Sequence, residues 1–261
     1  METEISKTQI DRLGDRLRKG NITDSDLRLL DEYRRSFTEA YNAVAETIRR
    51  QLNLEPTGRP AKSTTSIAEK LRRESIRLTQ IQDIAGCRLV VPEIADQEHV
   101  VASLAELFSD STVMDRRQNP SHGYRAVHVI ATMHKKPVEI QIRTDLQQLW
   151  AELSEKLSDL LDPAIKYGGG EDYIKELLTT SSSLNAQVEN EELRLLPLRQ
   201  KMERLASNVS SKIDLTDPRY QAIIDLQKEI ESHQANLTLL REKVLAILRN
   251  ANEFFSSLKE Q

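Results

Sequence analysis

Glycine and proline are scarce in this 261-residue sequence, which has only 8 of each. Together they reach about half of their usual share, which excludes collagen-like and linker-dominated chains and favours helix. Aromatic residues are also few, with 4 phenylalanines, 1 tryptophan and 6 tyrosines. With a mean hydropathy of −0.53, this composition predicts a soluble, largely helical protein with thin, elongated parts.

Long apolar runs and paired cysteines are missing as well. No apolar run approaches the roughly 20 residues that a membrane-spanning helix needs. The acidic start, Met-Glu-Thr-Glu, does not resemble a secretory signal peptide. The single cysteine, Cys87, cannot form an intrachain disulfide. These absences predict a cytoplasmic protein with no membrane partner.

Excess charge of one sign is small over the whole chain but not locally. The net charge of −4 argues against a general binder of polyanions. From Arg59 to Arg88, however, the sequence contains seven basic residues and only three acidic ones. This stretch is where the sequence predicts that phosphate groups are handled.

Helical periodicity dominates the sequence. The helices are expected over 3–53 as a pair broken at Gly20-Asn21 with a cap at Thr23 or Asp24, from Ser63 or Thr64 to about Leu78, over 94–108, from about Asp145 to Leu161, and from 172 to the end of the chain. The glycine run 168–170 lacks a following Gly-Lys-Ser/Thr and is therefore read as a loop, not as a P-loop.

Strand patterns occur between these helices. We expect short strands within 83–92 and 112–115, and a hairpin of Tyr124–Met133 with Pro137–Arg143, joined by His134-Lys135-Lys136. In the second hairpin strand Val138, Ile140 and Ile142 share one face, and Glu139, Gln141 and Arg143 share the other. In the first strand the same alternation groups Tyr124, Ala126, His128 and Ile130.

The C-terminal helices carry a continuous apolar seam with 3,4 spacing. Before a restart at Asp217-Pro218 it includes Leu195, Leu198, Met202, Leu205 and Val209, and afterwards Ile223, Leu226, Ile230, His233, Leu237, Leu240, Val244, Ile247, Ala251, Phe254 and Leu258. An antiparallel hairpin of this one chain is the preferred interpretation, and pairing with another chain is the alternative. Through these helices the chain is expected to form a homo-oligomer or to bind an antitoxin-like protein.

Three clusters carry residue types suited to phosphate chemistry. Ser66, Lys70 and Arg73 lie at i, i+4 and i+7 on one helix face with Lys62 at its start, which suits a polyphosphate. Asp83-Ile-Ala-Gly-Cys-Arg88 places a carboxylate before a strand. Gly123-Tyr-Arg-Ala-Val-His128 precedes Glu139-Ile-Gln-Ile-Arg-Thr144, and a Trp150-Ala151 pair follows on the next helix.

The order of these motifs closely resembles the synthetase domain of the RelA/SpoT family over about residues 40–170. The resemblance implies an α+β domain with a mixed sheet of about five strands flanked by helices. It also implies a pyrophosphotransferase of the GTP pyrophosphokinase type, which moves pyrophosphate from ATP to a 3′-hydroxyl and releases AMP. No histidine is followed by aspartate, the pair that the family's hydrolase domain needs, so a member with the synthetase domain alone is expected.

The resemblance also assigns roles to individual residues. Asp83 would hold Mg²⁺, and Glu139 would be a second metal contact or the general base. On the ATP side the assigned residues are Lys62, Ser66, Lys70 and Arg73 for the triphosphate, Arg88 for the adenine, and Arg59, one position before Pro60, where the family usually has arginine. On the acceptor side they are Tyr124 for stacking on the base, His128 near the phosphates, and Gln141 and Arg143 on the polar strand face.

The acceptor itself is open at this stage. GDP or GTP, giving (p)ppGpp, is the preferred interpretation, although the loop from Pro120 to Gly123 lacks the lysine usual in the family. The alternative is the 3′-terminal adenosine of tRNA, as in toxin-type members, with the basic pairs Arg116-Arg117 and Lys135-Lys136 gripping the RNA. A non-catalytic binding module is disfavoured because Asp83 and Glu139 are both present.

Three segments summarise this organisation. We expect N-terminal helices at 1–55, a synthetase core at 56–170 and a helical hairpin at 171–261.

Overall fold

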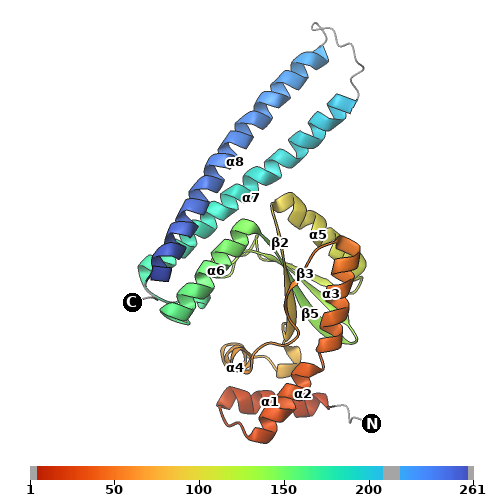
Figure 1. The fold of residues 1–261 in the computed structure, drawn as a ribbon, viewed down its shortest axis with the longest axis vertical. Helices are drawn as coiled ribbons and strands as arrows, with labels where there is room; N and C mark the ends of the chain where they lie inside the picture. Colours follow the sequence, from red (N-terminus) through yellow and green to blue (C-terminus); the bar gives the residue numbers. More distant parts are fainter. Residues whose placement is uncertain (1–4, 208–217, 258–261) are drawn as a thin grey trace. The chain divides into compact units, whose positions relative to one another are not determined.

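The computed structural model describes residues 5–207 and 218–257 (Figure 1). Its helices are α1 (Lys7–Lys19), α2 (Asp24–Arg35), α3 (Thr38–Leu52), α4 (Thr64–Arg73), α5 (Ile94–Leu107), α6 (Asp145–Leu160), α7 (Asp172–Ser207) and α8 (Pro218–Ser257), with short 3₁₀ turns η1 (Leu78–Gln80) and η2 (Ile165–Tyr167). Its strands are β1 (Thr57–Arg59), β2 (Ala85–Val91), β3 (Thr112–Asp115), β4 (Val127–Met133) and β5 (Lys136–Thr144).

The chain divides into two compact units. The first comprises residues 1–89, 100–115 and 127–142 and holds most of the sheet. The second comprises residues 90–99, 116–126 and 143–261 and holds α6, α7 and α8. The three sequence segments expected above stay a prediction.

A five-stranded sheet organises the first unit. The strand order is β1-β2-β5-β4-β3, and β1/β2, β3/β4 and β4/β5 are antiparallel pairs. The predicted α+β fold with a mixed sheet of about five strands flanked by helices is therefore confirmed. Val138, Ile140 and Ile142 are fully buried along one face of β5, as their alternation predicts.

The hairpin of β4 and β5 is tighter than predicted. Only His134 and Lys135 form the turn, with φ angles of 49° and 62°. Two successive positive φ angles are typical of the type I′ turn, whose twist matches that of the paired strands. At its other end β4 begins at Val127, so the prediction that Tyr124 and Ala126 lie on this strand is wrong.

Tyr124 instead closes a turn. His122 and Gly123 have φ angles of 52° and 89°, and the Tyr124 N–H donates to the Ser121 carbonyl at 2.9 Å. Two left-handed residues in a row form a turn directly before Tyr124, and regular pairing with β5 begins only at Val127.

The N-terminal region forms three helices, not the two expected. Thr23 caps α2 as predicted, accepting from the Asp26 N–H. The unexpected break falls at Ser36-Phe37, where the Ser36 hydroxyl donates to the Tyr33 carbonyl at 2.6 Å. Phe37 is buried there with its ring 5.3 Å from that of Tyr33. The sequence offered no glycine or proline to mark this break.

Helix α4 begins after its Ser63 cap, as predicted, but it ends at Arg73, not near Leu78. Glu74 is extended (φ −109°, ψ 135°). Arg18 of α1 donates from Nε to the Leu71 carbonyl at 2.8 Å, so a terminal carbonyl of α4 is satisfied by a tertiary contact.

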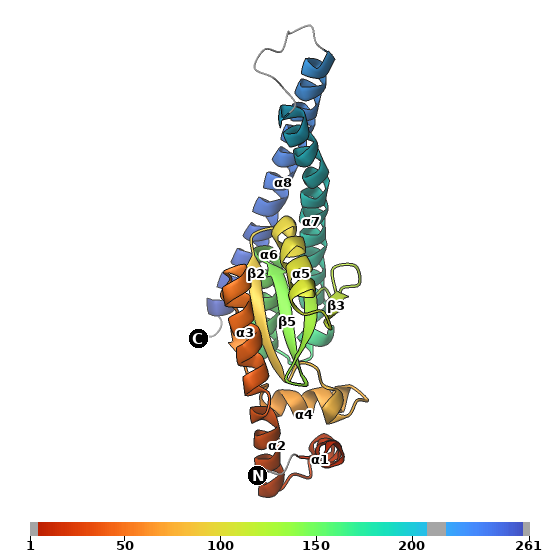
Figure 2. The same cartoon turned by 90° about the vertical axis from the view of Figure 1, so that its right-hand side faces the viewer.

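Helices α6, α7 and α8 form the core of the second unit. Helices α7 and α8 run antiparallel side by side, as predicted for a hairpin of this chain, and α6 packs against both (Figures 1 and 2). Their shared core contains Trp150, Leu153, Leu157, Leu178, Val188, Leu195, Leu237, Val244, Leu248 and Phe255. Helix α8 begins at Pro218 as predicted, whereas Asp217 and Leu258 lie outside the described residues.

The seam of α8 departs from the predicted register near its C-terminal end. Phe255 is 5% exposed and Phe254 is 59% exposed, the reverse of the expectation. Leu248 is buried where Ile247 was expected. The 3,4 spacing drifts against 3.6 residues per turn. At this end of α8, Lys156 of α6 donates to the Asn252 carbonyl at 2.9 Å.

None of the helices in the described ranges combines the length and apolar character that crossing a membrane requires.

We expect Phe255→Ala to lower the free energy of unfolding by about 3 kcal/mol, because it leaves a cavity in the shared core. The control Phe254→Ala should cost less than about 1 kcal/mol, since that ring is mostly exposed. Urea unfolding followed by Trp150 fluorescence measures both. Equal costs for the two variants would contradict the register seen here.

Candidate active site

The carboxylate of Asp83 is held between two lysines in the first unit. Lys62 Nζ donates to Oδ2 at 2.5 Å, and Lys70 Nζ donates to Oδ1 at 2.8 Å. All three side chains are mostly buried, with exposures of 16%, 21% and 17% for Lys62, Lys70 and Asp83. The cluster therefore combines two positive charges with one negative charge and has a net charge of +1.

Burial alone would raise the pKa of Asp83, but the charges and hydrogen bonds of Lys62 and Lys70 outweigh it and lower the pKa to about 2. Asp83 is consequently ionised at neutral pH. In a net positive cluster of this kind, the lysines can bind phosphate oxygens in place of the carboxylate, and the carboxylate can bind a metal ion.

Local structure explains why these side chains converge. The Lys62 N–H donates to the Ile84 carbonyl at 2.6 Å, which ties the start of α4 to the segment before β2. Lys70 follows two turns into α4. The other members of the predicted stripe have partners of their own: Ser66 bonds to the cap residue Ser63, and Arg73 pairs with Glu74.

Glu139 forms a second polar centre, on β5. Its Oε1 lies 3.0 Å from His128 Nδ1, and its Oε2 accepts from Gln141 Nε2 at 2.7 Å. The register places His128 directly opposite Gln141 and Ile130 opposite Glu139, so these side chains share one sheet face. Alternation along each strand grouped Glu139 with Gln141 and His128 with Ile130, but it did not predict that His128 and Gln141 both bind Glu139.

Burial would raise the pKa of Glu139, and the Asp83 charge acts in the same direction. The hydrogen bonds from His128 and Gln141 and the electrostatic effect of His128 outweigh both, so the pKa of Glu139 is lowered. Glu139 is thus a buried, ionised carboxylate whose two oxygens are oriented by neighbours. The interaction with Asp83 also means that the two carboxylates lie within electrostatic reach of each other.

Gly86 of β2 lies close to the backbone of Glu139. A Cβ atom at this position would lie 3.1 Å from the Glu139 carbonyl oxygen and 3.6 Å from the Glu139 Cβ. A larger side chain at 86 would therefore press on the backbone that carries Glu139. The glycine in Asp-Ile-x-Gly-x-Arg has a direct steric reason.

Arg59 and Arg88 lie on this same sheet face. Arg59 is paired with Gly86 across β1 and β2, and Arg88 is paired with Thr57 two positions away. Residues paired directly across antiparallel strands point to the same side, so both arginines share the side of Glu139. Arg59, not Pro60, is thus the residue that the register turns towards this face.

The two remaining predicted residues, Tyr124 and Arg143, belong to the second unit and contact each other. The Tyr124 hydroxyl accepts from Arg143 Nη2 at 3.0 Å and from Nε at 3.3 Å. The guanidinium carbon lies 5.0 Å from the centroid of the ring. Arg143 also donates from Nη1 to Gln148 Oε1 at 3.0 Å. The sequence carried no signal for this pairing, because it depends on how the 122–124 turn folds.

The donor set fits a magnesium ion in its chemistry. Asp83 and Glu139 are two ionised carboxylates, and Mg²⁺ usually takes one or two carboxylates in addition to phosphate oxygens and water. Among the residues that the structure describes, no three acidic, histidine or cysteine side chains gather as a ready-made metal cage. The pair is suited to an ion that arrives with a phosphate ligand.

The fold is an α+β domain whose polar sheet face carries an ionised carboxylate, Glu139, with Asp83 and its two lysines within electrostatic reach. Residues 58–158 match the family model described as the region found in RelA / SpoT proteins. This segment is therefore a RelA/SpoT region, and the resemblance predicted from the motifs is confirmed for it.

Curated relatives share part of the chain. Uncharacterized proteins of Mycobacterium bovis and Mycobacterium tuberculosis are 39% identical over 114 residues, which is 42% of this chain and 42% of each relative. The chain thus matches less than half the length of these relatives.

Solved structures with a similar arrangement include the small alarmone synthetase 1 from Bacillus subtilis bound to its product pppGpp. The TM-score is 0.49 at 24% identity, covering 68% of this chain and 100% of that chain. A second crystal structure of the same protein has a TM-score of 0.48 at 27% identity, covering 69% of this chain and 100% of that chain.

Because the lysines lower the pKa of Asp83 from 3.8 to about 2, its ionised form stabilises the fold above pH 4, and this contribution fades as the pH falls towards 2. Asp83→Asn should therefore cost about 2 kcal/mol at pH 7 and roughly half as much at pH 3. Urea unfolding at both pH values measures this.

The control for this experiment is Asp15→Asn, which removes an exposed ion pair with Arg18 and should cost less than about 0.5 kcal/mol at either pH. A cost of Asp83→Asn that is the same at pH 3 and pH 7 would contradict the assignment.

Proposed function

We propose that this protein transfers pyrophosphate from ATP to the 3′-hydroxyl of GDP or GTP, making (p)ppGpp and releasing AMP. The observation that carries the proposal is the pair of ionised carboxylates, Asp83 beside Lys62 and Lys70 and Glu139 beside His128 and Gln141, inside a RelA/SpoT region. We infer the reaction type from the family resemblance, and the arrangement of charges is compatible with that reaction.

The donor side needs cations that bind a triphosphate. Lys62 and Lys70 neutralise Asp83 and leave an excess positive charge for the phosphates of ATP. We assign Ser66 and Arg73 to the same task from α4, and Arg59 and Arg88 to the nucleoside end, since both lie on the Glu139 face of the sheet.

Glu139 activates the acceptor in this proposal. Its carboxylate takes the proton of the 3′-hydroxyl as the 3′-oxygen forms a bond to the β-phosphorus of ATP. The bond between that phosphorus and the bridging oxygen of the α-phosphate breaks, and AMP leaves with the electron pair. His128 and Gln141 orient the two carboxylate oxygens, so the base is fixed before the acceptor arrives.

Asp83 and Glu139 are also the residues that would hold Mg²⁺, which when bound neutralises charge on the transferring phosphates. Exchange of the lysine ammonium groups from Asp83 to phosphate oxygens would free the Asp83 carboxylate for the ion.

The acceptor side is assigned to Tyr124, His128, Gln141 and Arg143. The Tyr124 ring provides a stacking surface for the base, and Arg143 holds the Tyr124 hydroxyl. Stacking alone does not distinguish guanine from adenine. Polar groups around the base and the groups that hold the acceptor phosphates must therefore supply the preference for a free guanine nucleotide.

In the tRNA alternative, the basic pairs Arg116-Arg117 and Lys135-Lys136 would bind the RNA backbone. Two of them have other partners: Arg117 is paired with Glu98 at 2.7 Å, and Lys136 Nζ lies 4.8 Å from the centroid of the Phe37 ring. Reversing these charges would disturb the fold as well as any RNA contact. The exposed Lys135 is the better single probe.

We expect Glu139→Gln to lower kcat by at least about 100-fold, because the amide cannot accept the proton. The control Glu55→Gln alters an exposed carboxylate paired with Arg49 in the same unit and should keep kcat within about two-fold. AMP release, followed with saturating ATP and GDP, measures both variants. Activity of Glu139→Gln near that of the wild type would overturn the role of Glu139.

The acceptor is tested with γ-labelled ATP and, in parallel, GDP, GTP or deacylated tRNA. We expect label on GDP or GTP and an unchanged rate for Lys135→Glu. Label on tRNA alone, falling steeply between about 50 and 200 mM salt, would replace the nucleotide by tRNA as the acceptor. Label on none of the three would refute the proposed transfer.

A further inference from the structure

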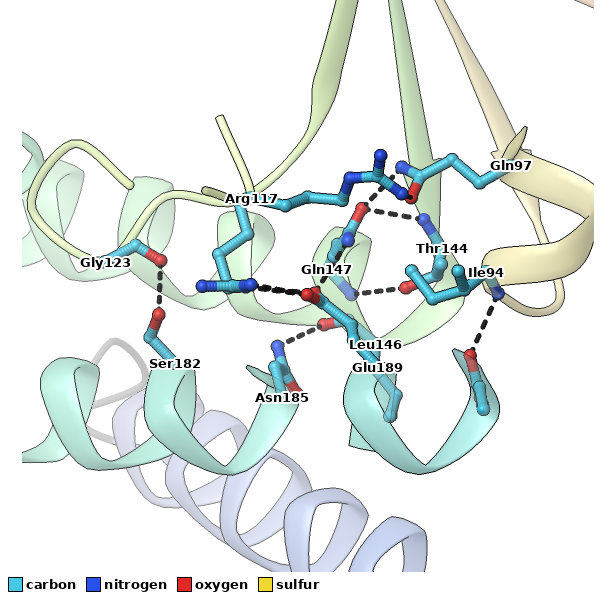
Figure 3. Close-up of polar contacts among 12 residues, drawn as sticks. Ile94, Gln97, Arg117, Gly123, Thr144, Leu146, Gln147, Ser182, Asn185 and Glu189 are labelled. Atoms are coloured by element: carbon cyan, nitrogen blue, oxygen red, sulfur yellow. Dashed lines mark hydrogen bonds and ion pairs between the residues drawn. The ribbon is translucent and has the colours of Figure 1, made fainter. Parts of the chain in front are cut away.

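Helix α7 places a buried carboxylate that the reaction itself does not use. Glu189 is 8% exposed in its side chain and accepts from Arg125 Nε at 3.0 Å and 3.1 Å through its two oxygens. Arg125 Nη2 adds a third bond, and Gln147 Nε2 donates to Oε1 at 2.8 Å. Figure 3 shows Glu189 pointing from α7 towards Gln147 at the start of α6.

Both partners of Glu189 border the acceptor-side residues. Arg125 directly follows Tyr124. Gln147 accepts the Thr144 N–H at 3.0 Å, and Thr144 directly follows Arg143. Tyr124 and Arg143 then bond to each other through the tyrosine hydroxyl. One carboxylate thus closes a ring of contacts that runs through Arg125 and Tyr124 on one side and Gln147 and Arg143 on the other.

Further contacts from α7 hold the same turn. The Ser182 hydroxyl donates to the Gly123 carbonyl at 2.7 Å (Figure 3). Gly123, at φ 89°, leaves no room for a Cβ, which would meet the ring of Trp150 at 2.8 Å and the Ser182 Cβ at 3.3 Å. The residue before Tyr124 is therefore fixed by α6 and α7, and the residue after it by Glu189.

Charge makes Glu189 the sensitive point of this arrangement. Arg125 is 12% exposed, so without a carboxylate its guanidinium would be left buried and uncompensated. A buried unpaired charge is strongly unfavourable, and the least costly response is for the arginine to turn towards water. If the Arg125 side chain turns away, the backbone next to Tyr124 loses its tie to Glu189 of α7.

We propose that Glu189 is a positioning residue for the acceptor: through Arg125 and Gln147 it fixes the orientation of Tyr124 and Arg143. The first helix of the C-terminal hairpin thereby sets acceptor affinity without touching the acceptor. This inference rests on the proposed function in assigning Tyr124 and Arg143 to the acceptor side.

The test compares Michaelis constants in Glu189→Gln. We expect the KM for the acceptor to rise by at least about ten-fold and the KM for ATP to change by less than two-fold. A purely structural role would reduce the amount of folded enzyme, which lowers the apparent kcat and leaves both KM values unchanged. Unchanged KM values, whatever happens to kcat, would overturn the proposal.

Glu191→Gln is the matched control. Glu191 lies on the same helix, has the same 8% side-chain exposure, and pairs with Arg194 and with His233 of α8 instead of the Tyr124 turn. Its acceptor KM should stay within two-fold. If Glu189→Gln fails to fold, Arg125→Lys keeps the opposite charge but loses the forked contact, and it should raise the acceptor KM in the same direction.

Trp150, the one tryptophan of the sequence, supplies a readout that needs no activity. Its ring packs on Gly123. We expect Glu189→Gln to increase acrylamide quenching of its fluorescence at least two-fold, with Glu191→Gln unchanged. If the wild type transfers pyrophosphate to no acceptor, the proposed function fails and this measurement still decides the positioning role. Identical quenching in both variants would then overturn it.

Discussion

The close approach of β2 and β5 at Gly86 is the constraint on which the candidate active site depends. A Cβ there would lie 3.1 Å from the Glu139 carbonyl oxygen, so a larger residue would require the two strands to move apart slightly. Asp83, three residues before Gly86, then acts electrostatically on Glu139 across the sheet. The site is in this sense a property of sheet packing as much as of the charged residues themselves.

Asp83, Glu139 and Glu189 are buried carboxylates, and each is held by a different kind of side chain. Two lysines hold Asp83, and their ammonium groups can bind phosphate oxygens instead of the carboxylate. A histidine and an amide hold Glu139, which keeps it ionised and oriented. A forked arginine and an amide hold Glu189, an arrangement that resists movement. Flexible point charges thus surround Asp83, whereas planar groups surround Glu139 and Glu189.

Local patterns predicted much of the fold. The alternation of Val138, Ile140 and Ile142 and the cap at Ser63 are observed where the sequence places them. The failures concern burial: α2 ends at the Ser36-Phe37 break, where Phe37 is buried, and Phe255 replaces Phe254 in the seam where α8 meets its neighbours. Neither event has a local signature, because burial is decided by what packs on the residue.

The sequence by itself determined the chemical inventory: the motif order that marks a RelA/SpoT region, the cationic helix, and the polar face of β5. Those features depend on spacing of two to four residues, which strand and helix geometry convert directly into shared faces. Only the tertiary structure decided which groups meet, such as Lys62 with Asp83 and Arg125 with Glu189, separated by 21 and 64 residues along the chain. Such contacts arise from the packing of whole elements, and no short-range periodicity encodes them.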